Sequence, residues 1–301
     1  MIITDSALSL IKDEDCKHIE ELRPVCKNKI GSAEFVWDSN TKYAGTVVQG
    51  DLWLDKTHIS KDNYFLLVDK ETNHVNIDYP FLGLGFSDGK YTSFLQHLKN
   101  QDLIDELAFS FYFNLGVSPY PILYLGSLNL EQLDLGKDFA VVEMTVETEF
   151  MGLIDNLLAN GKPLFPKGSK MLTKFDSGES MISLPMIFIE PILDLIQKTL
   201  YTMCKISDSK PATFSCKLKD FNQLPKLSFV IDGLEFVLNG KDYINTCTNP
   251  TPSDAFYNCD FLIQFEDHTL HGYWITFGKN FLGDSNFRPD VYAEILYVVL
   301  P

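Results

Sequence analysis

The chain of 301 residues lacks the sequence features of membrane spans, metal sites and nucleotide sites. No apolar run approaches the ~20 residues that cross a bilayer, and the first residues have neither the charged start nor the long apolar core of a secretory signal. No Cys/His spacing suits zinc, no Gly-rich phosphate loop occurs, and no Asn-x-Ser/Thr acceptor has a permitted middle residue. The sequence therefore implies no metal, no cofactor and no transmembrane helix.

Positive charge is also scarce. The chain has 25 Lys and Arg residues against 41 Asp and Glu residues, which gives a net charge of −16. Such a chain repels nucleic acid and anionic membranes, so we expect neither as a partner. The acidity itself has two explanations that stay open, simple solubility or adaptation to an acidic medium.

Apolar material is plentiful. Hydrophobic residues make up 45% of the chain, 23 of them Phe, and the length suffices for two domains with cores of their own. Six cysteines suggest disulfides and an oxidising compartment, with six reduced structural cysteines as the alternative.

The spacing of apolar residues is mostly that of β-strands. Residues 33–37 and 46–54 predict one hairpin, and residues 224–238 predict another with its turn at Asp232-Gly233. Helical spacing is confined to residues 93–100 and 185–201. We therefore predict an all-β protein with a few short helices.

Two kinds of motif occur twice, in alternating order. Residues 2–11 contain Asp5-Ser6-Ala7 after an apolar pair, and residues 175–185 contain Asp-Ser-Gly after Phe175 and end in Leu-Pro. Each is followed at a distance by an apolar-apolar-Gly run, one at residues 81–83 and one at residues 281–283. The order is loop, partner, loop, partner.

This arrangement resembles that of the pepsin-like aspartic proteases, over nearly the whole chain from Asp5 to about Tyr297. The resemblance implies a bilobal acid protease fold with a central cleft, an N-terminal lobe at residues 1–135 and a C-terminal lobe at residues 136–301. Family members have several strands before the first catalytic loop, so the N-terminal lobe is expected to be incomplete at its start.

The resemblance also implies the site. Asp5 and Asp176 form the catalytic dyad, in which two close carboxylates share one proton and activate a water. Trp37 takes the place of the Tyr in the flap. The supporting loop residues and the partner strands are Ser6, Ala7, Ser177, Gly178, Phe81, Leu82, Gly83, Phe281, Leu282 and Gly283. The alternative is that each Asp is an ordinary turn residue and Trp37 an ordinary strand aromatic.

Three positions depart from the family pattern. Ala7 replaces a Gly, and an added methyl in a packed site typically costs ~1–3 kcal/mol. Leu8 and Glu179 stand where the family has hydroxyl donors to the two Asp side chains, and neither Leu nor an ionised Glu donates a hydrogen bond. We therefore expect cleavage at least ~10²-fold slower than that of a standard member.

By resemblance, the disulfides pair Cys16 with Cys26 and Cys216 with Cys259, which leaves Cys204 and Cys247 for a third bridge. The same resemblance implies a secreted protein or one in an acidic lumenal compartment.

Three functional hypotheses remain. The first is a monomeric aspartic endopeptidase with impaired activity, acting on extended peptides or unfolded proteins. The second is a catalytically inactive homologue that binds peptides or inhibitors. The third is a fragment that folds poorly by itself.

Overall fold

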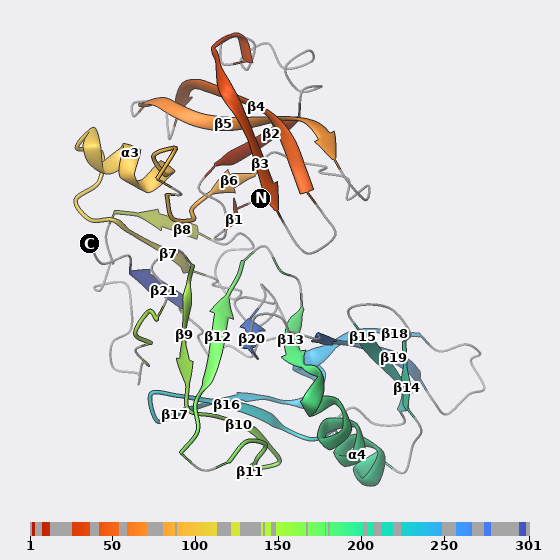
Figure 1. Ribbon diagram of the computed structural model, residues 1–301. Helices are drawn as coiled ribbons and strands as arrows, with labels where there is room; N and C mark the ends of the chain where they lie inside the picture. The colour runs from red at the N-terminus through yellow and green to blue at the C-terminus, as the bar shows by residue number, and fades with distance from the viewer. Residues whose placement is uncertain are drawn as a thin grey trace.

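A computed structural model describes residues 2–3, 8–12, 26–36, 42–53, 59–71, 81–87, 89–112, 122–126, 140, 142–145, 149–166, 168–177, 179, 181–200, 204–207, 212–218, 224–248, 257–266, 274–277 and 295–298. The protein is mostly β, as predicted, and two short α-helices occur among these residues. We call residues 2–126 the N-terminal region and residues 140–298 the C-terminal region. Figure 1 shows the sheets of the two regions as two groups, one above the other.

The N-terminal region contains a four-stranded sheet and a two-stranded sheet. The four-stranded sheet has the order β2 (Ser9–Lys12), β5 (Ile59–Glu71), β4 (Lys42–Trp53) and β3 (Lys29–Val36). The two-stranded sheet pairs β1 (Ile2–Ile3) with β6 (Leu82–Gly83). β3 and β4 form the predicted first hairpin, with register from Val36 opposite Lys42 to Lys29 opposite Val48.

The C-terminal region is built on an eight-stranded sheet. Its order is β14 (Cys204–Ile206), β15 (Ala212–Leu218), β19 (Tyr257–Glu266), β13 (Ile182–Pro185), β20 (Trp274–Phe277), β12 (Met171–Phe175) and β9 (Met151–Ile154), with β18 (Ile244–Thr248) also paired to β19. A separate four-stranded sheet has the order β11 (Lys162–Pro163), β10 (Asn156–Ala159), β16 (Leu227–Ile231) and β17 (Leu234–Leu238).

A third group of strands joins residues 295–298 to the N-terminal region. β21 (Ile295–Val298) pairs antiparallel with β7 (Ala108–Tyr112), which pairs with β8 (Ile122–Leu125). Figure 1 shows these strands between the two groups of sheets. A strand of the C-terminal region is therefore hydrogen-bonded to the N-terminal region.

Local sequence explains the ends of several elements. The α3 helix (Phe94–Asn100) begins after Ser93, whose side chain accepts from the Gln96 backbone N–H. The β16–β17 hairpin turns at Asp232 and Gly233, both with positive φ, as predicted. The α4 helix (Ile189–Leu200) follows a 3₁₀ turn η2 (Met186–Phe188), and a second turn, η4 (Gly240–Tyr243), precedes β18.

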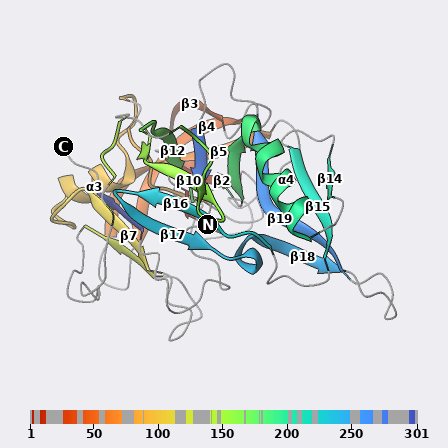
Figure 2. The same cartoon turned by 90° about the horizontal axis from the view of Figure 1, so that it is seen from below.

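The buried apolar side chains form one large cluster in the C-terminal region and three smaller ones elsewhere. The large cluster packs the α4 side chains Ile192 and Ile196 against the sheet, and Figure 2 shows α4 beside β15 and β19. The smaller clusters lie between the long strands of the N-terminal region and around α3. Burial of these side chains is the main stabilising contribution to the fold.

Candidate active site

Asp176 directly follows strand β12 and begins the loop that leads to β13. Both of these strands pair with β20. β12 runs parallel to β20, with Phe175 opposite Phe277. β13 runs antiparallel to β20, with Ile182 opposite Phe277. β20 therefore lies between the strand that leads into the Asp176 loop and the strand that leaves it, which fixes the loop at both ends.

The Asp176 side chain is buried and paired with a lysine. Only 7% of the residue is exposed, and its Oδ2 lies 3.1 Å from Nζ of Lys174. Residues two apart on an extended strand project to the same side, which brings the two groups together. Lys174 was not predicted as a site residue, although its charge two residues before Asp176, in a strand with three apolar residues, is a visible signal in the sequence.

Glu179 supports the loop as a hydrogen-bond acceptor. Its backbone N–H donates to the Asp176 carbonyl oxygen at 3.3 Å, and its carboxylate oxygen Oε1 accepts from the Met181 N–H at 3.2 Å. A carboxylate in this role donates nothing to Asp176. The structure thus places Glu179 within the loop and gives it a backbone-bracing contact.

The N-terminal region repeats the strand arrangement. β1 runs parallel to β6, with Ile3 opposite Gly83, and Leu10 pairs antiparallel with Phe81. The Ser9 hydroxyl also accepts from the Gly83 N–H at 3.2 Å. The predicted partner segment 81–83 thus lies between the residues that precede and follow the Asp5 loop.

A chain of phenylalanines connects the N-terminal partner segment to Asp176. The Phe86 ring lies 4.6 Å from the Phe150 ring, which also meets Phe109 edge-on at 5.5 Å. The Phe150 carbonyl oxygen accepts from the Phe175 N–H at 2.9 Å, and the Phe175 side chain packs against clusters of both regions. These contacts hold the end of β12 against the N-terminal region.

Leu8 has a structural role in place of a hydroxyl. It is 8% exposed and packs in a buried cluster with Leu10, Tyr43 and Phe81. The apolar residue at this position is therefore part of the N-terminal core.

Several predicted site residues lie outside the described residues. They are Asp5, Ser6, Ala7, Cys16, Trp37, Gly178, Phe281, Leu282 and Gly283. The hairpin that leads to Trp37 is described up to Val36 and Lys42, and Lys42 forms a 3.0 Å ion pair with Glu34. The proposed meeting of Asp5 and Asp176 stays a prediction.

Strand β20 takes the place in the C-terminal region that segment 81–83 takes in the N-terminal region. Among the described residues, β20 occupies the partner position, and its Thr276-Phe277 is followed in sequence by Gly278. The partner run predicted from the sequence, residues 281–283, lies a few positions later and outside the described residues. The overlooked signal is the apolar-rich strand Trp274–Phe277 directly before a glycine.

The predicted Cys216–Cys259 disulfide is wrong. The bonds join Cys204 to Cys216 and Cys247 to Cys259, with Cα–Cα distances of 4.2 and 4.1 Å. Cys26 is also disulfide-bonded, but Cys16 lies outside the described residues, so their pairing stays a prediction. Cross-strand disulfides of this kind fit an oxidising compartment.

Strand register gives the physical reason for this pairing. Cys204, Cys216, Cys259 and Cys247 stand opposite one another on four adjacent strands. A Cys216–Cys259 bond would leave the outer two cysteines three strand spacings apart, about 14 Å, which no disulfide spans. The observed pairing uses all four. The available sequence signal was the separation of 12 residues within each pair.

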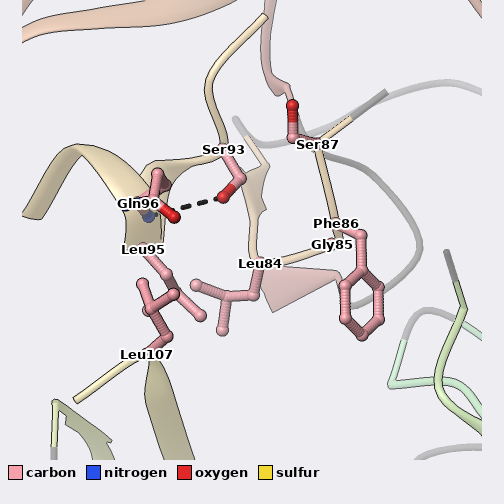
Figure 3. Close-up of a pocket in the computed structure, with 8 residues that line it drawn as sticks. All are labelled: Leu84, Gly85, Phe86, Ser87, Ser93, Leu95, Gln96 and Leu107. Carbon is pink, nitrogen blue, oxygen red and sulfur yellow. Dashed lines mark hydrogen bonds between the residues drawn. The ribbon is translucent and has the colours of Figure 1, made fainter. Parts of the chain in front are cut away.

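A small pocket adjoins the N-terminal partner segment. It has a volume of about 110 Å³ and lies between residues 84–87, the start of α3 and Leu107, as Figure 3 shows. Its polar side chains already have partners within the chain: Ser87 donates to the Tyr91 carbonyl oxygen, Ser93 caps α3, and Gln96 donates to Asn100. The pocket is therefore mainly an apolar space.

The described part of the chain contains no group of His, Cys, Asp or Glu side chains arranged to hold a metal ion. Within the same residues, no helix combines the length and apolar character needed to span a membrane.

Comparison with known proteins identifies the family. No curated protein matches the chain. Residues 30–291 match the family model described as eukaryotic aspartyl protease, a stretch that includes Asp176 and begins after Asp5. Because this match covers most of the chain and the fold is mostly β with a duplicated loop arrangement, the chain belongs to the eukaryotic aspartyl protease family, the pepsin-like aspartic proteases.

Proposed function

We propose that this chain is an aspartic endopeptidase homologue in which peptide-bond hydrolysis by an Asp5–Asp176 dyad is impaired. Family membership supports an aspartic peptidase function and peptide or protein substrates. The observation that carries the impairment is the contact between Lys174 Nζ and Asp176 Oδ2 at 3.1 Å.

Lys174 occupies a position on Oδ2 of Asp176 that proton transfer in catalysis would need. A catalytic carboxylate must accept a proton from water or share one with its partner carboxylate. An ammonium group donating to Oδ2 occupies one of the acceptor positions of Asp176. Proton sharing between two aspartates needs such a position, so this contact opposes it.

The loop residues support the same direction. The Glu179 carboxylate accepts a hydrogen bond from the Met181 N–H, while Leu8 is packed in the core. Neither supplies the hydroxyl donor that holds the dyad in the family. Removal of one preorganised donor at a charged site typically lowers the rate ~10²–10³-fold.

A second candidate is a catalytically inactive homologue that binds extended peptides or inhibitors. The Lys174–Asp176 pair favours this candidate, because an aspartate held by a lysine takes no part in proton transfer, while the fold around it is kept. The Phe86–Phe150–Phe175 contacts would keep the two regions together in either case.

Other features of the proposal follow the same family expectations. They include a monomer with lobes at residues 1–135 and 136–301, a secreted or acidic lumenal location, and no binding to nucleic acid or membranes. The net charge of −16 supports the last point.

The test is digestion of an unfolded protein substrate at acidic pH, with and without a transition-state-mimicking inhibitor of the family. We expect cleavage at least ~10²-fold slower than that of a standard member, sensitive to the inhibitor and abolished by Asp176→Asn. Brisk, inhibitor-sensitive cleavage by the unaltered chain would contradict the impairment.

The residual cleavage rate distinguishes the impaired endopeptidase from the inactive binding protein. No cleavage, together with measurable binding of the inhibitor by calorimetry, would support the inactive binding protein. A triple variant that restores Gly at Ala7 and hydroxyl side chains at Leu8 and Glu179 should raise the rate of an impaired enzyme. Its unfolding free energy must be measured in parallel, because a hydroxyl at the buried Leu8 position also destabilises the core.

A further inference from the structure

Four cysteines form a continuous row across one edge of the eight-stranded sheet. Cys204 on β14 stands opposite Cys216 on β15, Cys216 opposite Cys259 on β19, and Cys259 opposite Cys247 on β18. Directly opposite residues of antiparallel strands project to the same face of a sheet. All four sulfur atoms therefore lie in one row, with bonds at its two ends and no bond at its centre.

The row has an accessible outside and a buried inside. Cys216 and Cys259 are 3% and 0% exposed, whereas Cys204 and Cys247 are half-buried. The strands β14 and β18 that carry the outer cysteines lie at the periphery of the molecule in Figure 2. A reductant thus meets the outer sulfur of each disulfide before the inner one.

The two inner cysteines are close enough to bond. In an antiparallel strand, the N–H and C=O groups of one residue point toward the same neighbouring strand. A residue that forms a close, non-hydrogen-bonded pair with one neighbouring strand therefore forms a wider, hydrogen-bonded pair with the other. Cys216 and Cys259 each form the close pair with their outer partner, which makes their own Cα–Cα separation about 5.5 Å. This separation lies within the range of disulfides.

We propose that this row is a thiol–disulfide exchange site for a dithiol reductant. One thiolate of the dithiol attacks Sγ of Cys204, breaks the Cys204–Cys216 bond and releases the Cys216 thiolate. That thiolate attacks Sγ of Cys259, breaks the Cys247–Cys259 bond and forms the Cys216–Cys259 bond, and the Cys247 thiolate takes a proton. The second thiol of the dithiol then displaces Cys204 as a thiol and closes the reductant's own disulfide.

The atoms and electrons balance. The dithiol loses two electrons and two protons, and the protein changes from two disulfides to one disulfide and two thiols. Attack on Sγ of Cys247 leads to the same product by the mirror-image sequence.

Burial explains why exchange proceeds to the centre of the row. The first attack produces a thiolate at the buried Cys216, and an unpaired charge in an apolar core is costly. Transfer of the bond to Cys259 moves the charge to the half-buried Cys247, where water solvates it. The product keeps β15 and β19 joined and releases the two outer strands from their covalent links.

Partial reduction of the folded, unaltered chain tests the proposal. The folded chain is treated with substoichiometric dithiothreitol, quenched with acid, alkylated and mapped by mass spectrometry. We expect a main one-bond species with tags on Cys204 and Cys247 and a linked Cys216–Cys259 peptide. Tags on Cys204 and Cys216 together, with the Cys247–Cys259 bond intact, would overturn the proposal.

A pair of matched variants gives a second readout. Cys204→Ser with Cys247→Ser leaves the inner cysteines, which should form a disulfide on air oxidation. Cys216→Ser with Cys259→Ser leaves the outer cysteines about 14 Å apart, and both should stay free thiols. Free thiols in a folded inner-cysteine variant would contradict the proposed product, and the mapping of the unaltered chain decides the question if either variant fails to fold.

Discussion

The two regions build the same strand arrangement from different side chains. In the N-terminal region, segment 81–83 lies between β1 and Leu10, and in the C-terminal region β20 lies between β12 and β13. The residue two positions before the candidate aspartate is Ile3 in the first region and Lys174 in the second. Backbone hydrogen bonds carry the arrangement, so the fold persists while the chemistry of its side chains changes.

The regions also differ in how they are stabilised. The C-terminal region has one large apolar cluster and two cross-strand disulfides, whereas the N-terminal region divides its buried side chains among smaller clusters. Small cores tolerate the loss of a side chain less well than large ones. The N-terminal region should therefore respond more strongly to matched substitutions.

The largest effects should come from core truncation at equivalent positions. Leu10 and Ile182 each pair with the strand inside the loop, and they are 0% and 3% exposed. We expect Leu10→Ala and Ile182→Ala to lower the free energy of unfolding by about 2–5 kcal/mol each, with the greater loss for Leu10. Urea denaturation measures both, and a loss below about 1 kcal/mol at either position would show that the side chain there contributes little to the core.

Two glycines with similar backbone angles separate crowding from conformation. Gly126 has φ +87° and an added Cβ would lie 2.3 Å from the Ile104 Cβ, whereas Gly233 has φ +77° and nothing within 4 Å. Gly126→Ala should cost about 2–4 kcal/mol from overpacking and backbone strain, and Gly233→Ala about 1 kcal/mol from strain alone. Equal losses in thermal denaturation would show that Ile104 moves aside freely.

Replacement of Lys174 makes the second region resemble the first. In an impaired enzyme, Lys174→Met removes the ammonium contact at Oδ2 of Asp176, and we expect a rate increase of about ten- to a hundredfold, or about 1.4–2.7 kcal/mol in barrier height. The matched control is Lys170→Met, which removes the 3.0 Å ion pair with Asp155 elsewhere in the same region and should leave the rate unchanged. Equal rates for both variants in the digestion assay would argue against competition at Asp176.

The smallest effects concern the response to acid. Burial lowers the pKa of His97 from its ordinary 6.5, and the Gly233 N–H, followed by Lys170, lowers the pKa of Asp155 from 3.8. In both cases the unfolded chain binds the proton more readily, so each contribution to stability is present above the ordinary value and is lost as the pH falls through the lowered pKa.

Acid should thus weaken the N-terminal region first. His97→Gln should remove a loss of unfolding free energy that begins below pH 6.5. Asp155→Asn should remove a loss that begins below pH 3.8. Both groups are partly exposed and screened by solvent, so each effect should stay below about 1 kcal/mol. Unfolding free energies measured across this range test the order, and a reversed order would be incompatible with it.

Sequence patterns predicted those features that depend on nearby residues. The Asp232-Gly233 turn, the short helix that begins after Ser93 and the apolar spacing of α4 each arise from side chains within a few positions of one another. The same holds for the Asp176 loop, because its turn and flanking apolar residues are contiguous. Such local preferences need no knowledge of the rest of the fold.

Features that depend on the path of the backbone could not be predicted in this way. Lys174 was visible in the sequence and lies only two residues from Asp176, but their contact requires the backbone to stay extended past the end of β12. The disulfide pairs depend on strand register, and a shift of one residue changes which side chains meet. The sequence by itself determined the family, the strand-rich fold and the candidate aspartate. Only the tertiary structure decided which groups lie beside that aspartate and which cysteines bond, because the first depends on the backbone path into the loop and the second on how separate strands align in one sheet.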